Sequence, residues 1–127
     1  MMKDIRIHTI PHKDQRYDTV GDWVWQPDGS LDLYISDMGN PDSEWLCAMH
    51  ELTEVWLCKR ARITQSKVDA WDKSWKPTNS LNPDEPGCDP KSPYHKQHEA
   101  GEVIERVLCA LMGIDWHKYN ASYEDVG

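Results

Sequence analysis

The sequence predicts an α+β fold, in which a small antiparallel sheet of three strands packs on two long helices and one shorter helix. Three observations predict it. Residues 1–37 contain segments that alternate between apolar and polar side chains, which is typical of half-buried strands. Residues 41–62 and 93–113 instead carry apolar side chains at the spacing of helices. A proline-rich segment, 76–93, lies between the two, and the whole chain, 1–127, has the length of one domain.

The first strand is expected over residues 5–9, where Ile and Thr alternate with Arg and His before a proline ends the pattern. Two further strands, 23–25 and 31–35, flank a segment that contains Asp28 and Gly29. An Asp-Gly pair between two such segments is typical of a tight hairpin turn. We therefore expect these three strands to form one antiparallel sheet.

Asn40, Pro41 and Asp42 predict the start of the first long helix, over residues 41–62. Asparagine is a favoured N-cap, proline suits the first helical position, and an acid in the first turn interacts well with the helix dipole. A shorter helix should begin after Thr64. Its apolar face should carry Val68, Trp71 and Trp75.

The segment 76–93 contains five prolines and is expected to be an irregular loop that covers a binding site. The second long helix, 93–113, should end at Gly113, a typical helix C-cap. We expect its apolar face to pack against the first helix. That face is formed by Ala100, Ile104, Val107, Leu108 and Leu111.

Charge and composition argue against several classes of partner. A net charge of -8 and a pI near 5.1 argue against nucleic acid and anionic membranes, which attract clustered Lys and Arg. No stretch approaches the ~20 apolar residues of a membrane helix, and we expect no signal peptide at the start of the chain. The four cysteines form no C-x-x-C pair and are expected to be free thiols. A cytoplasmic location is therefore expected.

The H-E-x-x-E motif at residues 50–54 has the strongest chemical signal. His50 and Glu54 lie one turn apart in an apolar stripe of the first helix, where an unpaired carboxylate is costly. A divalent metal would satisfy both side chains, with ligand bonds of ~2.0–2.2 Å. Without a metal, they would form a buried hydrogen-bonded pair. The stripe is formed by Leu46, Cys47, Leu57 and Ala61.

Glu51 is rotated by about 100° from His50 around the helix, which places it at the edge of the apolar stripe. From there it could reach a water molecule on the metal, so we predict that Glu51 is the general base. The third ligand is expected from the second long helix, where His98 ranks above His95 because it lies beside the apolar face. Glu105 could orient His98 or bind the metal itself. Two imidazoles and a carboxylate suit zinc, with magnesium or manganese as alternatives.

The motifs M-H-E-L-T-E-V-W-L-C-K-R-A and D-E-P-G-C-D-P-K-S-P-Y-H-K-Q-H, followed by a helix ending in G-I-D-W, span much of the chain. In this order they resemble small bacteriophage and prophage proteins of unassigned function, which implies a phage-encoded protein. The first helix also resembles the active-site helix of zincin-like metalloproteases, which implies a zincin-like fold and a peptidase-like site. Glu54 stands where those enzymes have a second His, and its charge should make water at the metal less acidic.

These observations predict a zinc-dependent hydrolase with a peptide or small-molecule substrate. One alternative is a magnesium-dependent nucleotide pyrophosphohydrolase, whose acidic residues would be Glu51, Glu54, Glu99, Glu102 and Glu105. The other is a non-enzymatic phage protein that binds or inhibits a host protein and has a structural metal, with His95 as its fourth ligand.

A second H-E-x-x-E string occurs at residues 98–102. Because Glu102 should point away from the apolar face of its helix, we interpret this repeat as chance.

Overall fold

The computed structural model describes residues 3–76 and 85–126, which form one sheet and several helices. The strands are β1 (Ile5–Ile10), β2 (Gly21–Trp25) and β3 (Leu31–Ser36). The α-helices are α1 (Pro41–Arg60), α2 (Gln65–Ser74), α3 (His95–Met112) and α4 (Trp116–Ala121). Short 3-10 helices are η1 (His12–Asp14), η2 (Pro86–Cys88) and η3 (Ser122–Asp125). The predicted α+β class is confirmed.

The sheet is mixed, with strand order β1-β3-β2. β2 and β3 form the predicted antiparallel hairpin, in which Trp23 lies opposite Leu33. β1 instead runs parallel to β3, with Ile5 opposite Leu31, so the prediction of a purely antiparallel sheet is wrong. The physical reason is that residues 11–20 are long enough to cross two strand spacings, about 10 Å, so β2 need not pair with β1.

The ends of the helices follow their sequence signals. Asn40 Oδ1 accepts hydrogen bonds from the backbone N–H groups of Asp42, at 3.0 Å, and Ser43, at 3.4 Å. α1 ends slightly earlier than predicted, because Arg62 adopts a φ of 60° that is incompatible with the helix. Gly113 ends α3 with a φ of 71°, as expected for a glycine C-cap.

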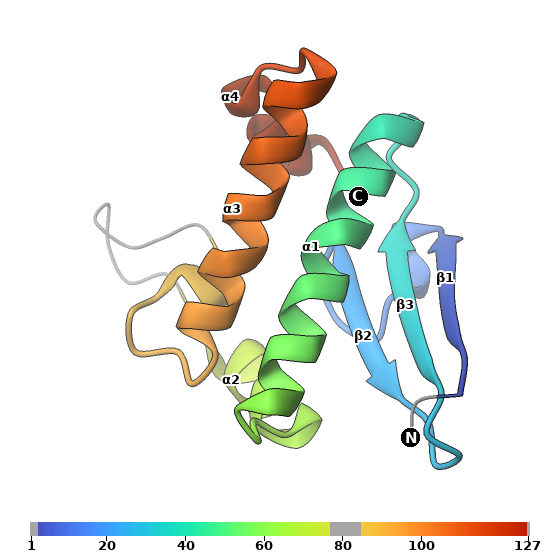
Figure 1. The fold of residues 1–127 in the computed structure, drawn as a ribbon, viewed down its shortest axis with the longest axis vertical. Coiled ribbons are helices and arrows are strands. Elements are labelled where there is room, and N and C mark those ends of the chain that lie inside the picture. Colours follow the sequence, from blue (N-terminus) through green and yellow to red (C-terminus); the bar gives the residue numbers. More distant parts are fainter. Residues whose placement is uncertain (1–2, 77–84, 127) are drawn as a thin grey trace.

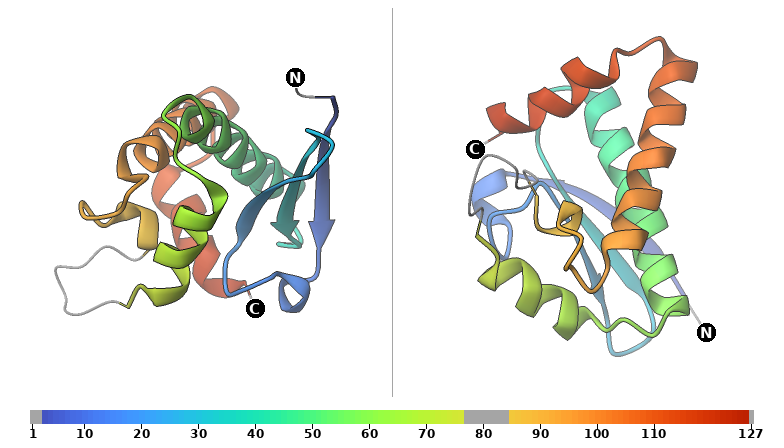
Figure 2. Two further views of the ribbon diagram at one scale, coloured as in Figure 1. Left: turned by 90° about the horizontal axis from the view of Figure 1, so that it is seen from below. Right: turned by 90° about the vertical axis from the view of Figure 1, so that its left-hand side faces the viewer.

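Helix α1 lies between the sheet and α3, as Figures 1 and 2 show from three directions. Its sheet-facing side contributes Val55 and Cys58 to a core that also contains Trp23, Leu31 and Leu33. Its other side meets α3 along much of the length of both helices. This arrangement brings the H-E-x-x-E motif of α1 to the contact with α3.

Helix α3 is rotated about its axis by roughly 100° relative to the prediction. Its buried residues are His98, Gly101, Glu105 and Cys109. The apolar face that should have packed on α1 is largely exposed, with Val107 51% and Leu111 78% accessible to solvent. The prediction is wrong because the polar stripe finds hydrogen-bonding partners in the interior, and buried polar groups with such partners are tolerated.

Part of the predicted proline-rich loop, residues 77–84, lies outside the described residues. The predicted role of the loop as a cover for the site therefore stays a prediction. The next residues form η2. Hydrogen bonds from Trp71 of α2 and from Trp75 hold this segment in place. Trp71 Nε1 donates to the carbonyl of Pro86 at 2.9 Å, and Trp75 Nε1 donates to Asp89 Oδ2 at 3.1 Å. These two bonds hold η2 close to the N-terminus of α3.

Among the helices of residues 3–76 and 85–126, none is long and apolar enough to cross a membrane.

Candidate metal centre

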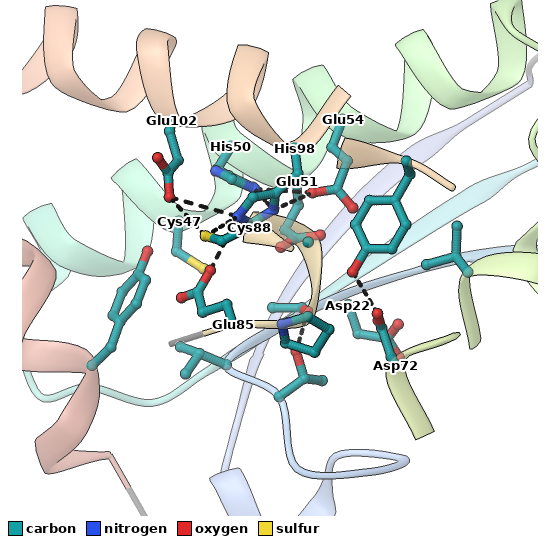
Figure 3. Close-up of a pocket in the computed structure, with 18 of the residues that line it drawn as sticks. Asp22, Cys47, His50, Glu51, Glu54, Asp72, Glu85, Cys88, His98 and Glu102 are labelled. Carbon is teal, nitrogen blue, oxygen red and sulfur yellow. Dashed lines mark hydrogen bonds and ion pairs between the residues drawn. The ribbon is translucent and has the colours of Figure 1, made fainter. Parts of the chain in front are cut away.

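Three buried side chains from two helices meet in the contact between α1 and α3 (Figure 3). His50 Nε2 lies 2.9 Å from Glu54 Oε2 and 3.2 Å from His98 Nδ1. His98 Nδ1 lies 3.3 Å from the same oxygen of Glu54. Each of the three residues is at most 6% exposed. The structure therefore brings three of the predicted metal ligands together in one cluster.

The other nitrogen of His50 is held by a hydrogen-bonded chain. His50 Nδ1 bonds to Glu105 Oε1, while Glu105 Oε2 accepts hydrogen bonds from the hydroxyls of Tyr119 and Tyr123. A carboxylate that accepts from Nδ1–H leaves the lone pair of Nε2 directed at the cluster, as metal-bound histidines require. Glu105 therefore orients His50. The sequence had instead suggested that Glu105 would orient His98.

Glu54 is also held on the side away from the cluster. Its Oε1 accepts a hydrogen bond of 3.3 Å from Trp23 Nε1, which belongs to β2. The other oxygen, Oε2, is the one that faces both histidines. The sheet thus determines which carboxylate oxygen is presented to the site.

Two glycines allow the surrounding backbone to approach the histidine rings. A Cβ atom on Gly101 of α3 would lie 2.8 Å from the ring of His50. A Cβ atom on Gly87 of η2 would lie 2.5 Å from the ring of His98. Both distances are shorter than van der Waals contact, so the positions of α3 and η2 against the rings depend on the absence of a side chain.

The electrostatics of the cluster favour positive charge. Burial lowers the pKa of His50, but hydrogen bonds with Glu105 and Glu54 outweigh burial and raise the pKa well above its ordinary value. His98 is affected in the same way, with its contact to Cys88 the largest of the influences that raise its pKa. Protons on the imidazoles, or a divalent cation in their place, would supply the charge that these groups require.

Glu51 points into the same cleft and is 9% exposed. Burial, followed by the neighbouring Glu54 carboxylate, raises its pKa well above the ordinary value. The cleft has a volume of about 960 Å³. Among the described residues that line it are nine carboxylates and a single lysine, Lys73. The cleft therefore has a strongly negative lining beside the histidines.

His95 lies apart from the cluster, although the sequence made it a candidate ligand. Its Nδ1 lies 3.0 Å from the carbonyl of Gly87, and its Nε2 lies 3.1 Å from Glu99. The side chain of Glu99 is 61% exposed and that of His95 is 22% exposed, so this pair lies outside the buried cluster. The expected four-ligand site of His50, Glu54, His98 and His95 is therefore not assembled, because His95 is not part of the cluster.

A second group of side chains that could bind a metal, which was not predicted from the sequence, surrounds the other nitrogen of His98. Glu85, Cys88 and Glu102 offer ligand atoms close to His98 Nε2 (Figure 3). The H-E-x-x-E string at residues 98–102 could have indicated this group. The structure places His98 and Glu102 side by side in it, which does not support the interpretation of the string as chance. The error came from the orientation of α3, because the polar face that carries Glu102 is turned towards the cleft.

Comparison with known proteins finds no matching family model, no matching curated protein and no matching solved structure. We therefore base the function on the site and its chemistry.

Proposed function

We propose that the protein is a zinc-dependent hydrolase whose ion is held by His50 Nε2, Glu54 Oε2 and His98 Nδ1. The observation that carries this proposal is the mutual distance of the three atoms, 2.9 to 3.3 Å. Tetrahedral ligands at about 2.0–2.1 Å from zinc lie about 3.3 Å from one another. Three atoms with this spacing, in the wall of a cleft, match three corners of a zinc site and leave the fourth open.

Glu51 is the proposed general base in this site. It neighbours His50 in the sequence and reaches the same cleft, so it can accept a proton from the attacking water and pass it to the leaving group. The motif on α1 matches the zincin-like arrangement in this respect, with Glu54 in place of the second histidine. We propose a peptidase-like reaction on this basis.

The lining of the cleft supports a peptide substrate with basic side chains. Nine carboxylates around the cleft attract cations and repel the phosphates of a nucleotide. Two of the acidic residues that a magnesium-dependent pyrophosphohydrolase would need are not free to bind the ion in this cleft. Glu99 lies at the surface, and Glu105 is hydrogen-bonded to His50. We further propose that the protein works in the cytoplasm of a host cell, where its cysteines stay reduced.

Metal content tests the ion site. We expect zinc to co-purify with or to be taken up by the full chain, and His50→Ala and Glu54→Gln each to lose about one zinc ion per chain by elemental mass spectrometry. His95→Ala and Glu99→Gln, which alter the surface side of α3, should keep the zinc content of the wild type. Equal zinc content in all five proteins, or no zinc in any, would contradict the proposed site.

Cleavage of peptide libraries tests the reaction. We expect zinc-loaded protein to cleave a fluorogenic library rich in Lys and Arg faster than one rich in Asp and Glu. Glu51→Gln should bind zinc normally and lose about 10²- to 10⁴-fold in rate, the usual contribution of a general base. Zinc bound at His50 without cleavage of either library would contradict the peptidase reaction and leave only a metal-binding protein.

A further inference from the structure

The ring of His98 faces two different groups of ligand atoms, one at each nitrogen. Its Nδ1 belongs to the cluster with His50 and Glu54. Its Nε2 lies 3.2 Å from Glu85 Oε2, 3.3 Å from Cys88 Sγ and 3.6 Å from Glu102 Oε1. Cys88 Sγ and Glu102 Oε1 are 3.4 Å apart. The site described above does not use this second group.

The second group has the spacing of a tetrahedral metal site. Zinc–sulfur bonds of about 2.3 Å and zinc–nitrogen or zinc–oxygen bonds of about 2.0–2.2 Å place neighbouring ligand atoms about 3.3–3.6 Å apart. The four separations given above, from 3.2 to 3.6 Å, fall close to that interval. A thiol, an imidazole and two carboxylates form a donor set that suits zinc and excludes magnesium, which prefers oxygen ligands alone.

Two elements of the fold bring these atoms together. His98 and Glu102 are one turn apart on α3, as His50 and Glu54 are on α1, so each helix offers a His and a Glu to the same region. Gly87 lets η2 press against the His98 ring, and this contact places Cys88 beside Nε2. The hydrogen bonds from Trp71 and Trp75 hold this segment in position.

We propose that Glu85, Cys88, Glu102 and Nε2 of His98 form a second zinc site, and that the His98 ring joins its ion to the first. This inference rests on the proposed function for the presence of the first ion. Binding of the second ion displaces the proton of the Cys88 thiol and the remaining ring proton of His98, so the ring binds both ions as an imidazolate and both protons pass to solvent.

The two sites differ in the number of protein ligands. The second site has four, so it is closed and its ion is structural, whereas the first has three and an open position. The second ion therefore holds the His98 ring and η2 at the edge of the cleft. Its charge also adds to the positive charge of the first site, which favours ionisation of water there.

Zinc content and cobalt spectra of the full chain test the second site. We expect about two zinc ions per wild-type chain, and about one in Cys88→Ser and in Glu102→Gln, by elemental mass spectrometry. Glu99→Gln, one turn away on the surface side of α3, is the matched control and should keep two. With cobalt in place of zinc, the wild type and His50→Ala should show the near-ultraviolet band of a thiolate-bound cobalt ion, and Cys88→Ser should not.

The outcomes distinguish this proposal from the proposed function. A single ion per wild-type chain that is lost in His50→Ala and kept in Cys88→Ser would overturn the second site and leave the first intact. Absence of the thiolate band from the cobalt-loaded wild type would overturn it without reference to any variant. Loss of the band only in Cys88→Ser, together with unchanged zinc in His50→Ala and Glu54→Gln, would instead overturn the first site and the bridge.

Discussion

At the scale of single residues, Asp72 is a buried carboxylate that the metal centre does not use. It accepts hydrogen bonds from the hydroxyls of Tyr17, at 2.8 Å, and Tyr94. Burial raises its pKa from 3.8 to about 6, because the two hydrogen bonds offset only part of the cost of placing the charge in the interior. The folded protein therefore favours the protonated form of Asp72.

This shift predicts a pH-dependent difference between the wild type and Asp72→Asn. A group with a raised pKa in the folded state contributes stability at low pH and loses that contribution as the pH rises from 3.8 through about 6. Relative to Asp72→Asn, the wild-type free energy of unfolding should fall by at most about 3 kcal/mol between about pH 4 and pH 7. Urea unfolding followed by tryptophan fluorescence measures this difference.

Asp4→Asn serves as the control for Asp72→Asn, because it removes a carboxylate whose side chain is 69% exposed. A difference between wild type and Asp72→Asn that stays constant over the same pH range would show that Asp72 keeps an ordinary pKa in the folded protein.

At the scale of elements, α3 is a helix whose interior face is polar. The helix approaches α1 closely at Gly101, where the ring of His50 occupies the space that a side chain would need. Several of its apolar side chains, such as Val103 and Leu111, are exposed to solvent. Around Gly101 the α1–α3 contact therefore depends on close approach and on hydrogen bonds, whereas further along the helices Leu46 and Cys109 bury apolar surface.

Gly101→Ala tests this contact, because steric fit and helix propensity predict opposite signs. In an open helix, alanine in place of glycine stabilises by about 1 kcal/mol. Here the added methyl group must displace the ring of His50, so we expect no gain in the free energy of unfolding and zinc affinity reduced at least about 10-fold. Unfolding and zinc titration measure the two effects.

The exposed position Ala110, on the same helix, supplies the matched control. Ala110→Gly should lower the free energy of unfolding by about 1 kcal/mol through helix propensity alone and leave zinc affinity unchanged. Stabilisation of the protein by Gly101→Ala, with full zinc affinity, would mean that α3 does not approach His50 as closely as described.

At the scale of the whole molecule, the apolar cluster that contains the central strand lies between the sheet and α1. Leu31, Leu33 and Ile35 of the central strand are at most 1% exposed. The contact between α1 and α3 holds the polar cluster around His50 and also a smaller apolar cluster, which contains Leu46 and Cys109. Leu33 therefore belongs to the apolar packing of the sheet, whereas the proposed chemistry lies at the contact between α1 and α3.

Two leucine substitutions test where the core lies. Leu33→Ala should lower the free energy of unfolding by about 2–5 kcal/mol, because it leaves a cavity between the sheet and α1. Leu111→Ala removes a side chain of the same size from an exposed position of α3 and should change the free energy by less than about 0.5 kcal/mol. Urea unfolding measures both changes. A similar decrease in the free energy of unfolding in both variants would mean that α3 packs through its apolar face, as predicted from the sequence.

Local signals in the sequence were sufficient for the elements and for half of the site. Asn40 and Gly113 mark helix ends, Asp28 and Gly29 mark the hairpin, and the spacing of His50 and Glu54 places both on one helix face. Each of these depends on interactions within a few residues of the chain, which is why one sequence suffices to find them.

The tertiary structure alone decided which distant segments meet. Apolar periodicity predicted that α3 would bury Ile104 and Leu111, whereas the structure buries its polar stripe, because Glu105 finds partners on α1 and α4. The parallel pairing of β1 with β3 and the approach of Cys88 to His98 are likewise contacts between segments distant in sequence. The reason is physical: a local pattern reports which face a side chain occupies, but its partner depends on how the packed elements satisfy every buried polar group together.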